Sequence, residues 1–600
     1  MRATHFYVST RLTVVMEIVL CVSSQSTTVI NTPSGSIMGL VNTVLGQDIA
    51  QFRNIPYAKP PTGKLRFKKP VPIEPWQGVL NGTAFGPSCV QEKSLGGAFL
   101  WEGLENKMMS EDCLQLNIYT TYPISSADKK PVMFMIHGGS YIRGQGTAYD
   151  SSYFAMKDVI GVNINYRLGV FGFLSTGDRI LPGNYGIWDM IEALKWVQAN
   201  IAAFGGDPDN VTIFGGSAGA ISVSLLASVP SNRGLFHRVI AQSGSATSLI
   251  SISLDPIRIA RQIMSDVGCI PTLNSTINSN VVTDCLQHIS ADLLLQASLY
   301  STMNVQYYGY FSIGSQLYPV VDGQLFRLKP MDSLSDPNSA ESAFFTSIDL
   351  IAGNTDNEGS VGTFTFYSYE ESMQFNTSDG YPSALLCDVM APAVARDVFQ
   401  AGSDISDMVC QRYSTNDIAQ RSRNILNLYG DSCFVAPTVQ ILNFHSQGQG
   451  LGKTYQYVFS QVTDSPTLFG KPYWMLGAGH AEETGYQFGP SNQKPACRAT
   501  AQARALTDTF NSYFVNFAKT GNPNEADLVF WPEYSYNDRK YIDIKYETTQ
   551  GENLFQDRMK FLLEEIPNKI KSASDETNSA PHPFISVHYW VWIVLITLSL

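Results

Sequence analysis

The amino-acid sequence predicts an α/β protein with a mostly parallel central sheet that helices cover on both faces. Between residues 130 and 245, short runs that are apolar throughout alternate with longer stretches whose apolar residues recur at helical spacing. A strand that is apolar on both faces is typical of a buried parallel sheet, and parallel neighbours require crossover helices. Sites in such sheets lie at the carboxyl ends of the strands, so we expect catalytic residues there.

The individual elements follow from the same pattern. Pairs of glycines end two of the apolar runs, which is typical of strands that stop at a turn. The expected strands are 131–136, 159–165, 211–214 and 239–242, and the expected helices are 187–202 and 218–227. Residues 250–345 and 360–450 are less periodic and richer in Ser, Asn and Tyr. We interpret them as helical and loop insertions over the sheet, within one domain that spans residues 25–565.

Charge and residue spacing exclude two classes of function. The 600 residues carry a formal net charge of −12, and no basic stripe is present that could neutralise phosphates. We therefore expect no nucleic-acid partner. The sequence contains no Cys-x-x-Cys, and its eight His residues show no metal-ligand spacing, so we expect no metal site.

The N-terminus has the order of a secretory signal peptide. Arg2 and Arg11 precede the apolar stretch 12–22, and the small residues Ser23 and Ser24 follow it. We predict a signal peptide over residues 1–24, with cleavage after Ser24, and a protein that enters the secretory pathway.

The cysteines and glycosylation sequons fit the same compartment. Eight cysteines remain after the signal peptide, and an even number in an exported chain predicts disulfides. We expect glycosylation at Asn81, Asn274 and Asn376. A fourth sequon, at Asn210, lies too close to an expected buried strand to be predicted as a site.

The C-terminus has the composition of a signal for a glycosylphosphatidylinositol (GPI) anchor. Small residues at 572–574 lie within a polar spacer over 566–583, and the apolar stretch 584–600 follows. We predict attachment at Ser572, with Asn578 as the alternative, and a location on the extracellular face of the cell membrane or a secreted form. A transmembrane helix is less favoured because the apolar stretch is short and no Lys or Arg follows it.

The segment 215–219 contains the pattern G-x-S-x-G. An apolar strand is expected before it and an apolar helix after it, which is the layout of a nucleophile elbow. The turn needs small flanking residues because the serine backbone is strained and must lift its hydroxyl clear of the sheet. We therefore expect Ser217 to be a nucleophile.

A serine hydroxyl is a weak nucleophile and needs a base, which in turn needs an orienting acid. In a chain with such an elbow the order is Ser, acid, His. His480 follows a run of small residues that lets an imidazole approach another element, and His445 is a second, less favoured base. Glu358 follows the short apolar run 350–352, so we expect it just past a strand end. Asp356 is its rival on spacing alone.

An oxyanion that develops on the substrate needs hydrogen-bond donors already in place, and backbone N–H groups serve this purpose. Gly138, Gly139 and Ser140 follow the expected strand 131–136 and can supply such donors. Ala218, the residue after the nucleophile, can supply another.

Many stretches of the chain match one known family in the right order. They are FRNIPYAKPPTGKLRF (52–67), SEDCLQLNIY (110–119), NYRLGVFGFL (165–174), GNYGIWDMIEALKWVQANIAAFGGDP (183–208), VTIFGGSAGA (211–220), AQSGS (241–245), YPVVDG (318–323), GNTDNEGS (353–360) and GHAEETGYQFG (479–489). Over nearly its whole mature length the chain resembles the type-B carboxylesterase and cholinesterase family. The resemblance implies the α/β-hydrolase fold and hydrolysis of a small-molecule carboxylic ester without a cofactor, and it leaves a homodimer open.

The resemblance also implies roles for particular residues. Ser217 would be the nucleophile, His480 the base and Glu358, rather than Asp356, the acid of a triad that forms an acyl-enzyme intermediate. Further implied features are the disulfides Cys89–Cys113 and Cys269–Cys285 and the ion pairs Arg66–Glu111 and Arg167–Asp189. Cys387, Cys410, Cys433 and Cys497 remain, with three possible pairings.

Several departures from the family pattern bear on the substrate. Gly216 stands where the family usually has Glu, Ser140 replaces a third glycine of the oxyanion loop, and Ala481 replaces the glycine after the catalytic His. None removes a catalytic group. The expected substrate-binding residues are Trp101, Ile313 and Ser315.

Two alternatives accompany the carboxylesterase hypothesis. Trp101 lies inside the expected Cys89–Cys113 loop, where cholinesterases place a Trp that stacks on quaternary ammonium, so a cholinesterase is the first. Against it, Val361 and Gly362 stand where cholinesterases carry aromatic residues. The second alternative is a non-catalytic adhesion protein like the neuroligins, which is disfavoured because all three triad residues are present.

Overall fold

The structure, a computed structural model, describes residues 26–92, 108–306, 317–463, 471–488 and 500–579. The expected signal peptide, Trp101, Ile313, Ser315, Cys497 and the apolar stretch 584–600 lie outside the described residues. The chain forms two compact units, Met1–Phe555 and Gln556–Leu600.

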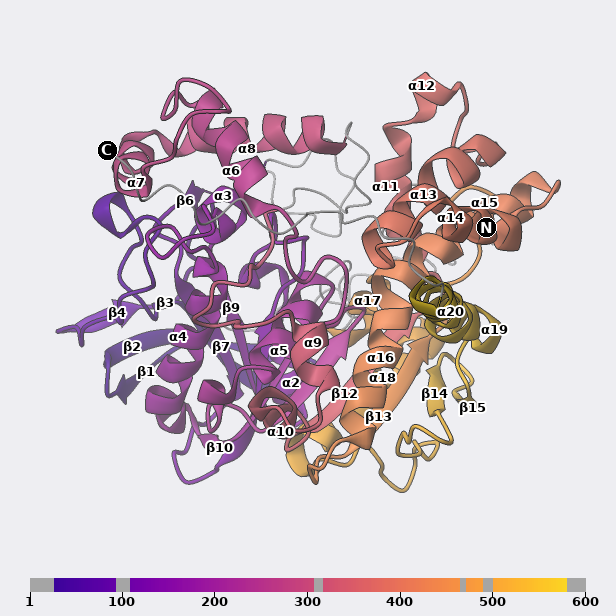
Figure 1. The fold of residues 1–600 in the computed structure, drawn as a ribbon. Helices are drawn as coiled ribbons and strands as arrows, with labels where there is room; N and C mark the ends of the chain where they lie inside the picture. The colour runs from indigo at the N-terminus through magenta and orange to yellow at the C-terminus, as the bar shows by residue number, and fades with distance from the viewer. Residues whose placement is uncertain (1–25, 93–107, 307–316, 464–470, 489–499, 580–600) are drawn as a thin grey trace, which may run out of the picture. The chain divides into compact units, whose positions relative to one another are not determined.

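The first unit is built on one large, mostly parallel sheet, which confirms the predicted fold class (Figure 1). Its centre, from β9 to β14, is parallel throughout. Antiparallel strands flank the centre on both sides. In spatial order the strands are β1 (Ser26–Thr32), β2 (Gly35–Val44), β3 (Gln47–Pro56), β7 (Gln115–Thr121), β9 (Ile160–Ile164), β8 (Lys130–Ile136), β10 (Gly206–Gly216), β11 (Arg238–Gln242), β12 (Asp349–Thr355), β13 (Thr454–Phe459), β14 (Lys540–Ile544) and β15 (Thr549–Glu552), and the short β4 (Val79–Asn81) pairs with β2.

All four expected strands of the segment 130–245 are present as β8, β9, β10 and β11. The two expected helices are α4 (Tyr185–Asn200) and α5 (Ala218–Ala227). The largest difference is that β10 begins at Gly206, five residues before the apolar run. Its pairing with β8 shifts register between Gly206 and Val211, so this polar start is irregular and has no apolar signature.

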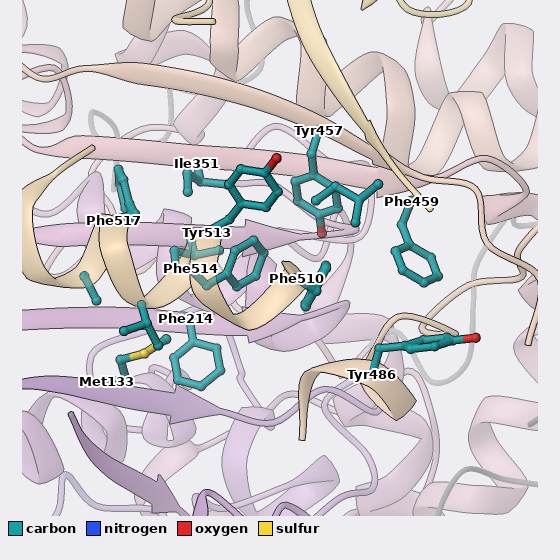
Figure 2. Close-up of a cluster of buried hydrophobic side chains, with 14 of the residues drawn as sticks. Met133, Phe214, Ile351, Tyr457, Phe459, Tyr486, Phe510, Tyr513, Phe514 and Phe517 are labelled. Carbon is teal, nitrogen blue, oxygen red and sulfur yellow. The ribbon is translucent and has the colours of Figure 1, made fainter. Parts of the chain in front are cut away.

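Helix α18 (Ala501–Thr520) covers one face of this sheet. Figure 2 shows its Phe510, Tyr513, Phe514 and Phe517 packed against side chains from the strands, among them Met133, Phe214, Ile351 and Tyr457. Strand residues point alternately to opposite faces. The neighbours that point the other way, such as Val132, Phe134, Ile213 and Leu350, are also fully buried. Both faces are therefore covered, as the apolar strands predict.

The expected insertions are helical. Residues 250–345 contain α6 (Pro256–Asp266), α7 (Ser279–His288), α8 (Ala291–Gln306), α9 (Pro330–Ser335) and α10 (Ala340–Phe345). Residues 360–450 contain α11 (Gly362–Tyr367), α12 (Glu370–Met373), α13 (Ala391–Ala393), α14 (Ser403–Tyr413), α15 (Ile418–Gly430) and α16 (Ala436–Gln447).

Three turns of π-helix interrupt these insertion helices, η6, η7 (Val394–Val398) and η8, and two of them lie just before a proline. The turn η6 (Leu385–Met390) precedes Pro392, and η8 (Asp431–Val435) precedes Pro437. Proline has no N–H for the helical hydrogen bond, and its ring clashes with the carbonyl one turn earlier. A wider π-turn relieves this clash without ending the helix. Pro437 thus accounts for the π-turn that joins α15 to α16.

Disulfides and buried ion pairs cross-link loops and helices of the first unit. Cys89–Cys113 and Cys269–Cys285 are bonded, with S–S distances of 2.04 and 2.06 Å. Of the four remaining cysteines, Cys387 pairs with Cys410, whereas Cys433 is buried and reduced. The even cysteine count did not predict this free thiol.

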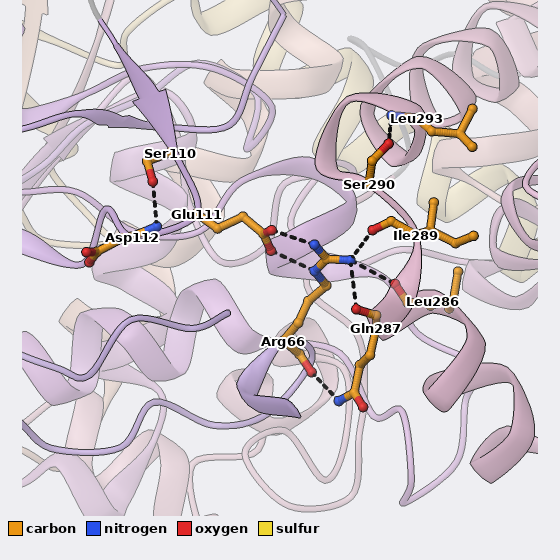
Figure 3. Close-up of polar contacts among 9 residues, drawn as sticks. All are labelled: Arg66, Ser110, Glu111, Asp112, Leu286, Gln287, Ile289, Ser290 and Leu293. Carbon is orange, nitrogen blue, oxygen red and sulfur yellow. Dashed lines mark hydrogen bonds and ion pairs between the residues drawn. The ribbon is translucent and has the colours of Figure 1, made fainter. Parts of the chain in front are cut away.

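Arg66 makes several polar contacts at once (Figure 3). Its guanidinium binds both carboxylate oxygens of Glu111 at 2.5–2.7 Å and donates to the carbonyl oxygens of Leu286 and Ile289. The second implied pair, Arg167–Asp189, is equally close at 2.6 Å and almost fully buried. Such bidentate pairs fix geometry as well as charge.

The second unit contains α19 (Gln556–Lys560), the π-turn η11 (Phe561–Glu565) and α20 (Ile566–Ser579). The predicted GPI-attachment residue, Ser572, is exposed and lies in α20. Among the described residues, no helix has both the length and the apolar character needed to cross a bilayer.

Candidate active site

Ser217 occupies the sharp turn between β10 and α5. Its backbone has φ 56° and ψ −123°, a conformation that is strained for a residue with a side chain. Two backbone hydrogen bonds hold it there: its N–H donates to Gln242 at 2.8 Å, and its carbonyl accepts from Ile221 at 3.0 Å. The strained turn leaves the serine half-buried at the carboxyl end of the parallel sheet.

The glycines around Ser217 differ in how closely they are packed. A Cβ on Gly215 or on Gly219 would overlap the carbonyl oxygen of Ile136, at the end of β8. Both positions therefore require glycine. A Cβ on Gly216 would meet only Gln242, at 3.9 Å. The family usually has Glu at this position. Lack of space for the first side-chain carbon does not explain why this chain has glycine instead.

The loop after β8 passes directly beside Ser217. A Cβ on Gly138 would lie 2.5 Å from the carbonyl oxygen of Gly216 and 3.1 Å from Cβ of Ser217. Gly139, Ser140 and Tyr141 all have positive φ, which coils the loop tightly. No acceptor within the described residues is hydrogen-bonded to the N–H of Gly139 or of Ser140.

His480 and Glu358 form a buried hydrogen-bonded pair. Nδ1 of His480 lies 2.5 Å from Oε2 of Glu358, and both side chains are less than a tenth exposed. The other carboxylate oxygen accepts from the N–H of Thr355 at 2.7 Å. The backbone N–H of His480 donates to the hydroxyl of Ser360 at 2.8 Å. The loop that carries Glu358 and Ser360 therefore holds His480 through both its side chain and its backbone.

Burial and charge act in opposite directions on this pair. Burial disfavours the charged imidazole, but Glu358 outweighs it, so the pKa of His480 lies above its usual 6.5. The buried Glu483 acts in the same direction when it is ionised. Burial and the charge of Glu358 raise the pKa of Glu483 to about 8, so this carboxyl is mostly neutral at pH 7.

The rival residues have other contacts. Asp356 accepts a hydrogen bond from the N–H of Ala478 at 2.6 Å, so it anchors the loop that carries His480, and burial raises the pKa of Asp356 to about 7. His445 is buried with both ring nitrogens bonded, to Thr454 and to the carbonyl of Ile348. Burial lowers the pKa of His445 to about 4. These contacts are structural.

A small, partly open cavity lies beside the loop that follows β8. Its lining is mainly aliphatic and aromatic, with Arg143 and Glu92 as the charged members. The apolar lining residues include Val90, Ile142, Leu168, Val170, Phe171, Leu295, Leu299 and Leu317.

Sequence reasoning missed two residues next to His480. The ring of Phe434 lies 4.6 Å from the imidazole, centroid to centroid, and Glu483 acts on its charge. Glu483 lies only three residues after His480, so the sequence could have indicated that the two side chains are close. Phe434 is 46 residues away in sequence and carries no motif.

The carboxylesterase family model matches residues 26–562 of this chain. The chain belongs to the carboxylesterase family. It is 34% identical to mouse carboxylesterase 3B, over 92% of this chain and 93% of that protein. It is also 34% identical to pig liver carboxylesterase, over 91% and 95%. Mouse neuroligin-2 is 31% identical over 90% of this chain and 68% of its own length.

Family membership agrees with the fold and with the resemblance inferred from the motifs, which is thereby confirmed. With its carboxylesterase relatives, it makes the chain a carboxylic ester hydrolase.

Proposed function

We propose that the enzyme hydrolyses esters by two-step acyl transfer, with Ser217 as nucleophile, His480 as base and Glu358 as orienting acid. The observation that carries this proposal is the buried His480–Glu358 hydrogen bond of 2.5 Å. It fixes the proton on Nδ1, so the other ring nitrogen, Nε2, is free to accept the serine proton.

In the first step, Nε2 of His480 takes the proton from Ser217 while Oγ bonds to the ester carbonyl carbon. The carbonyl oxygen becomes an oxyanion. When the intermediate collapses, the carbon–alkoxy bond breaks and His480 gives its proton to the departing alcohol. In the second step, a water loses a proton to His480 as its oxygen bonds to the acyl carbon. When this intermediate collapses, the bond between the acyl carbon and Oγ breaks, His480 returns the proton to Oγ of Ser217, and the acid is released.

The oxyanion is stabilised by N–H groups of Gly139, Ser140 and Ala218, with Gly138 beside them. Two observations support this role. The loop runs against Ser217, and the N–H groups of Gly139 and Ser140 have no acceptor within the described residues. Removing one such donor from an oxyanion hole typically lowers kcat by about 10²–10³.

The substrate is a neutral carboxylic ester with an apolar acyl or alkoxy group. The apolar cavity beside the oxyanion loop supports this choice, as do the carboxylesterases among the relatives. A cholinesterase is less favoured because Val361 and Gly362 occupy positions where cholinesterases carry aromatics. The neuroligin alternative is opposed by the hydrogen-bonded acid and base behind a strained serine.

Ser217→Ala tests the proposal. The purified ectodomain and this variant are assayed with a short aryl ester, a long acyl ester and a choline ester. We expect wild-type turnover of the neutral esters and none by the variant, with an unchanged melting temperature. Ser224→Ala is the control, because Ser224 is buried in helix α5, which follows Ser217, and its hydroxyl bonds only to carbonyls of its own turn. Equal turnover by Ser217→Ala and wild type would refute the triad.

We further propose that the mature protein is exported, glycosylated and GPI-anchored. Asn81, Asn274 and Asn376 are exposed, whereas the sequon at Asn210 includes the fully buried Thr212. Phosphatidylinositol-specific phospholipase C should release active enzyme from intact cells, and the released enzyme should carry glycans at those three residues only. Peptides from beyond residue 583 in the mature protein would contradict the anchor.

A further inference from the structure

A single helical stripe contacts both the acid and the base of the site. Leu426 and Gly430 belong to α15, and Phe434 lies in the π-turn η8, so the three are spaced at i, i+4 and i+8. Backbone angles remain helical from α15 through η8 into α16. Residues four apart lie on one face of a helix. The stripe therefore presents three successive contacts to the catalytic loops.

The first two contacts are backbone to backbone. A Cβ on Gly359 would overlap the carbonyl oxygen of Leu426. A Cβ on Gly430 would overlap the N–H of Gly359 and lie 3.0 Å from Cβ of Glu358. Two glycines thus let the helix touch the loop that carries the acid, with no side chain between them.

The third contact is ring to ring. Phe434 is fully buried, and its ring lies 4.6 Å from the imidazole of His480 at an interplanar angle of 39°. The π-turn ahead of Pro437 sets the direction of this side chain, because a π-turn changes the angle between successive residues. The next residue back, Cys433, is a buried thiol whose pKa burial raises, so this element brings no charge to His480.

The hydrogen bond to Glu358 fixes only one atom of the imidazole. A ring held at Nδ1 alone can still tilt, and the tilt moves Nε2 away from the serine. A second contact on the ring face removes that freedom. A cation within about 6 Å of an aromatic centroid is also stabilised by the ring, most strongly when both are buried. The imidazolium that forms in each acyl transfer meets this condition.

We propose that Phe434 is a positioning residue for His480, which fixes the plane of the imidazole and stabilises its charged form. The inference rests on the proposed function, because it assigns a role to Phe434 only if His480 is the base. The titratable groups that face His480 are Glu358 and Glu483, and neither is altered by changing Phe434.

The test is the pH profile of kcat/KM for a short aryl ester with wild type, Phe434→Leu and Phe434→Tyr. Leu keeps apolar bulk without a ring, so the base should lose stabilisation of its charged form. We expect the acidic limb of the profile to shift to lower pH by about half to one unit. This shift follows from the loss of a cation–π contact of about 1 kcal/mol. We also expect kcat to fall about tenfold with a smaller change in KM, because Nε2 is less well aligned. The Tyr variant retains the ring and should keep the wild-type limb.

Phe345→Leu is the matched control. Phe345 is buried and packs against the imidazole of His445 at 4.9 Å, a histidine outside the site. This variant should lose a similar amount of unfolding free energy to Phe434→Leu. It should keep the acidic limb and the kcat of the wild type. Phe434→Met, which is long and apolar but not aromatic, repeats the test if the Leu variant does not fold.

The outcomes separate the two proposals. Ser217→Ala is assayed in parallel, and activity that survives it refutes the proposed function whatever Phe434 does. If Ser217→Ala is inactive but Phe434→Leu or Phe434→Met keeps the wild-type limb, Phe434 only fills space and the inference is wrong.

Discussion

The two halves of the proposed active site are held by different means. Around Ser217 the chain is fixed by its own backbone: glycines that admit no Cβ, a strained φ, and hydrogen bonds between main-chain groups. Around His480 the geometry depends on buried side chains, namely Glu358, Ser360, Phe434 and Glu483. The nucleophile half should therefore tolerate almost no change in backbone, whereas the acid–base half should respond mainly to changes in charge and ring contacts.

The largest effect should come from disturbing the close backbone packing around Ser217. Gly219→Ala places a Cβ onto the carbonyl oxygen of Ile136, so β8 and α5 must separate. We expect a loss of about 3 kcal/mol in unfolding free energy and no measurable esterase activity. Gly216→Ala is the matched control, because its Cβ meets nothing closer than 3.9 Å. Chemical denaturation and an ester assay of both variants measure the difference, and equal stabilities would show that backbone packing is not what fixes this half.

The next effect concerns charge in the acid–base half. Glu358→Gln keeps the shape of the acid but removes the charge that favours the imidazolium, so kcat/KM should fall by about 10⁴. Asp356→Asn should lower it far less, because Asp356 bonds to the backbone of Ala478 and not to His480. Steady-state kinetics on the two variants decide between the acids. A larger loss for Asp356→Asn would reverse the assignment.

Glu483 links the site to the pH dependence of stability. Its folded-state pKa of about 8 lies above the unfolded value of 4.5, so the native state binds the extra proton between these two pH values. Its contribution therefore becomes unfavourable as pH rises from about 4.5 to 8. Glu483→Gln should be more stable than wild type at pH 9, and the advantage should shrink toward zero at pH 4.

Melting temperatures at pH 5, 7 and 9 test this prediction. Glu482→Gln is the contrast: Glu482 is buried and paired with Lys471, so its loss should destabilise the protein at pH 7 and 9. An advantage of Glu483→Gln that does not grow with pH would mean that this carboxyl is not held neutral.

The smallest effect is expected when a charge is added next to Ser217, in the half that is held by its backbone. Gly216→Glu restores the residue that the family usually has at this position, and the first carbon of its side chain has room. We expect a change of less than about 1 kcal/mol in stability. An added carboxylate that reaches the imidazole should move the acidic limb of kcat/KM to higher pH, because nearby negative charge favours the imidazolium. An unchanged limb would mean that the new carboxylate points away from His480.

The same division explains what the sequence could predict. A strained turn packed with glycines is determined by residues that are close in sequence. Residues 211–227 contain the strand, the glycines and the helix of this turn in one stretch. The chain order of a triad then restricts the choice of acid and base, and Glu358 and His480 are the pair that the structure brings together.

What could not be predicted depends on contacts between distant segments. Phe434 reaches His480 only because helix α15 lies on the acid loop and Pro437 widens the turn. The unpaired Cys433 was missed for the same reason, since a cysteine count carries no information about burial inside a helix. The polar start of β10 was missed because its five residues pair irregularly and have no apolar periodicity.

The π-turn at 431–435 means that this helix contains a residue more than an uninterrupted α-helix would need over the same span. Each residue of an α-helix turns its successor by about 100°. A deletion of one residue in this turn would therefore rotate Leu426 and Gly430 relative to α16, although every remaining side chain would keep its identity. The alignment of acid and base thus depends on the length of this segment as well as on its composition, and a change in length would leave no altered residue at the site itself.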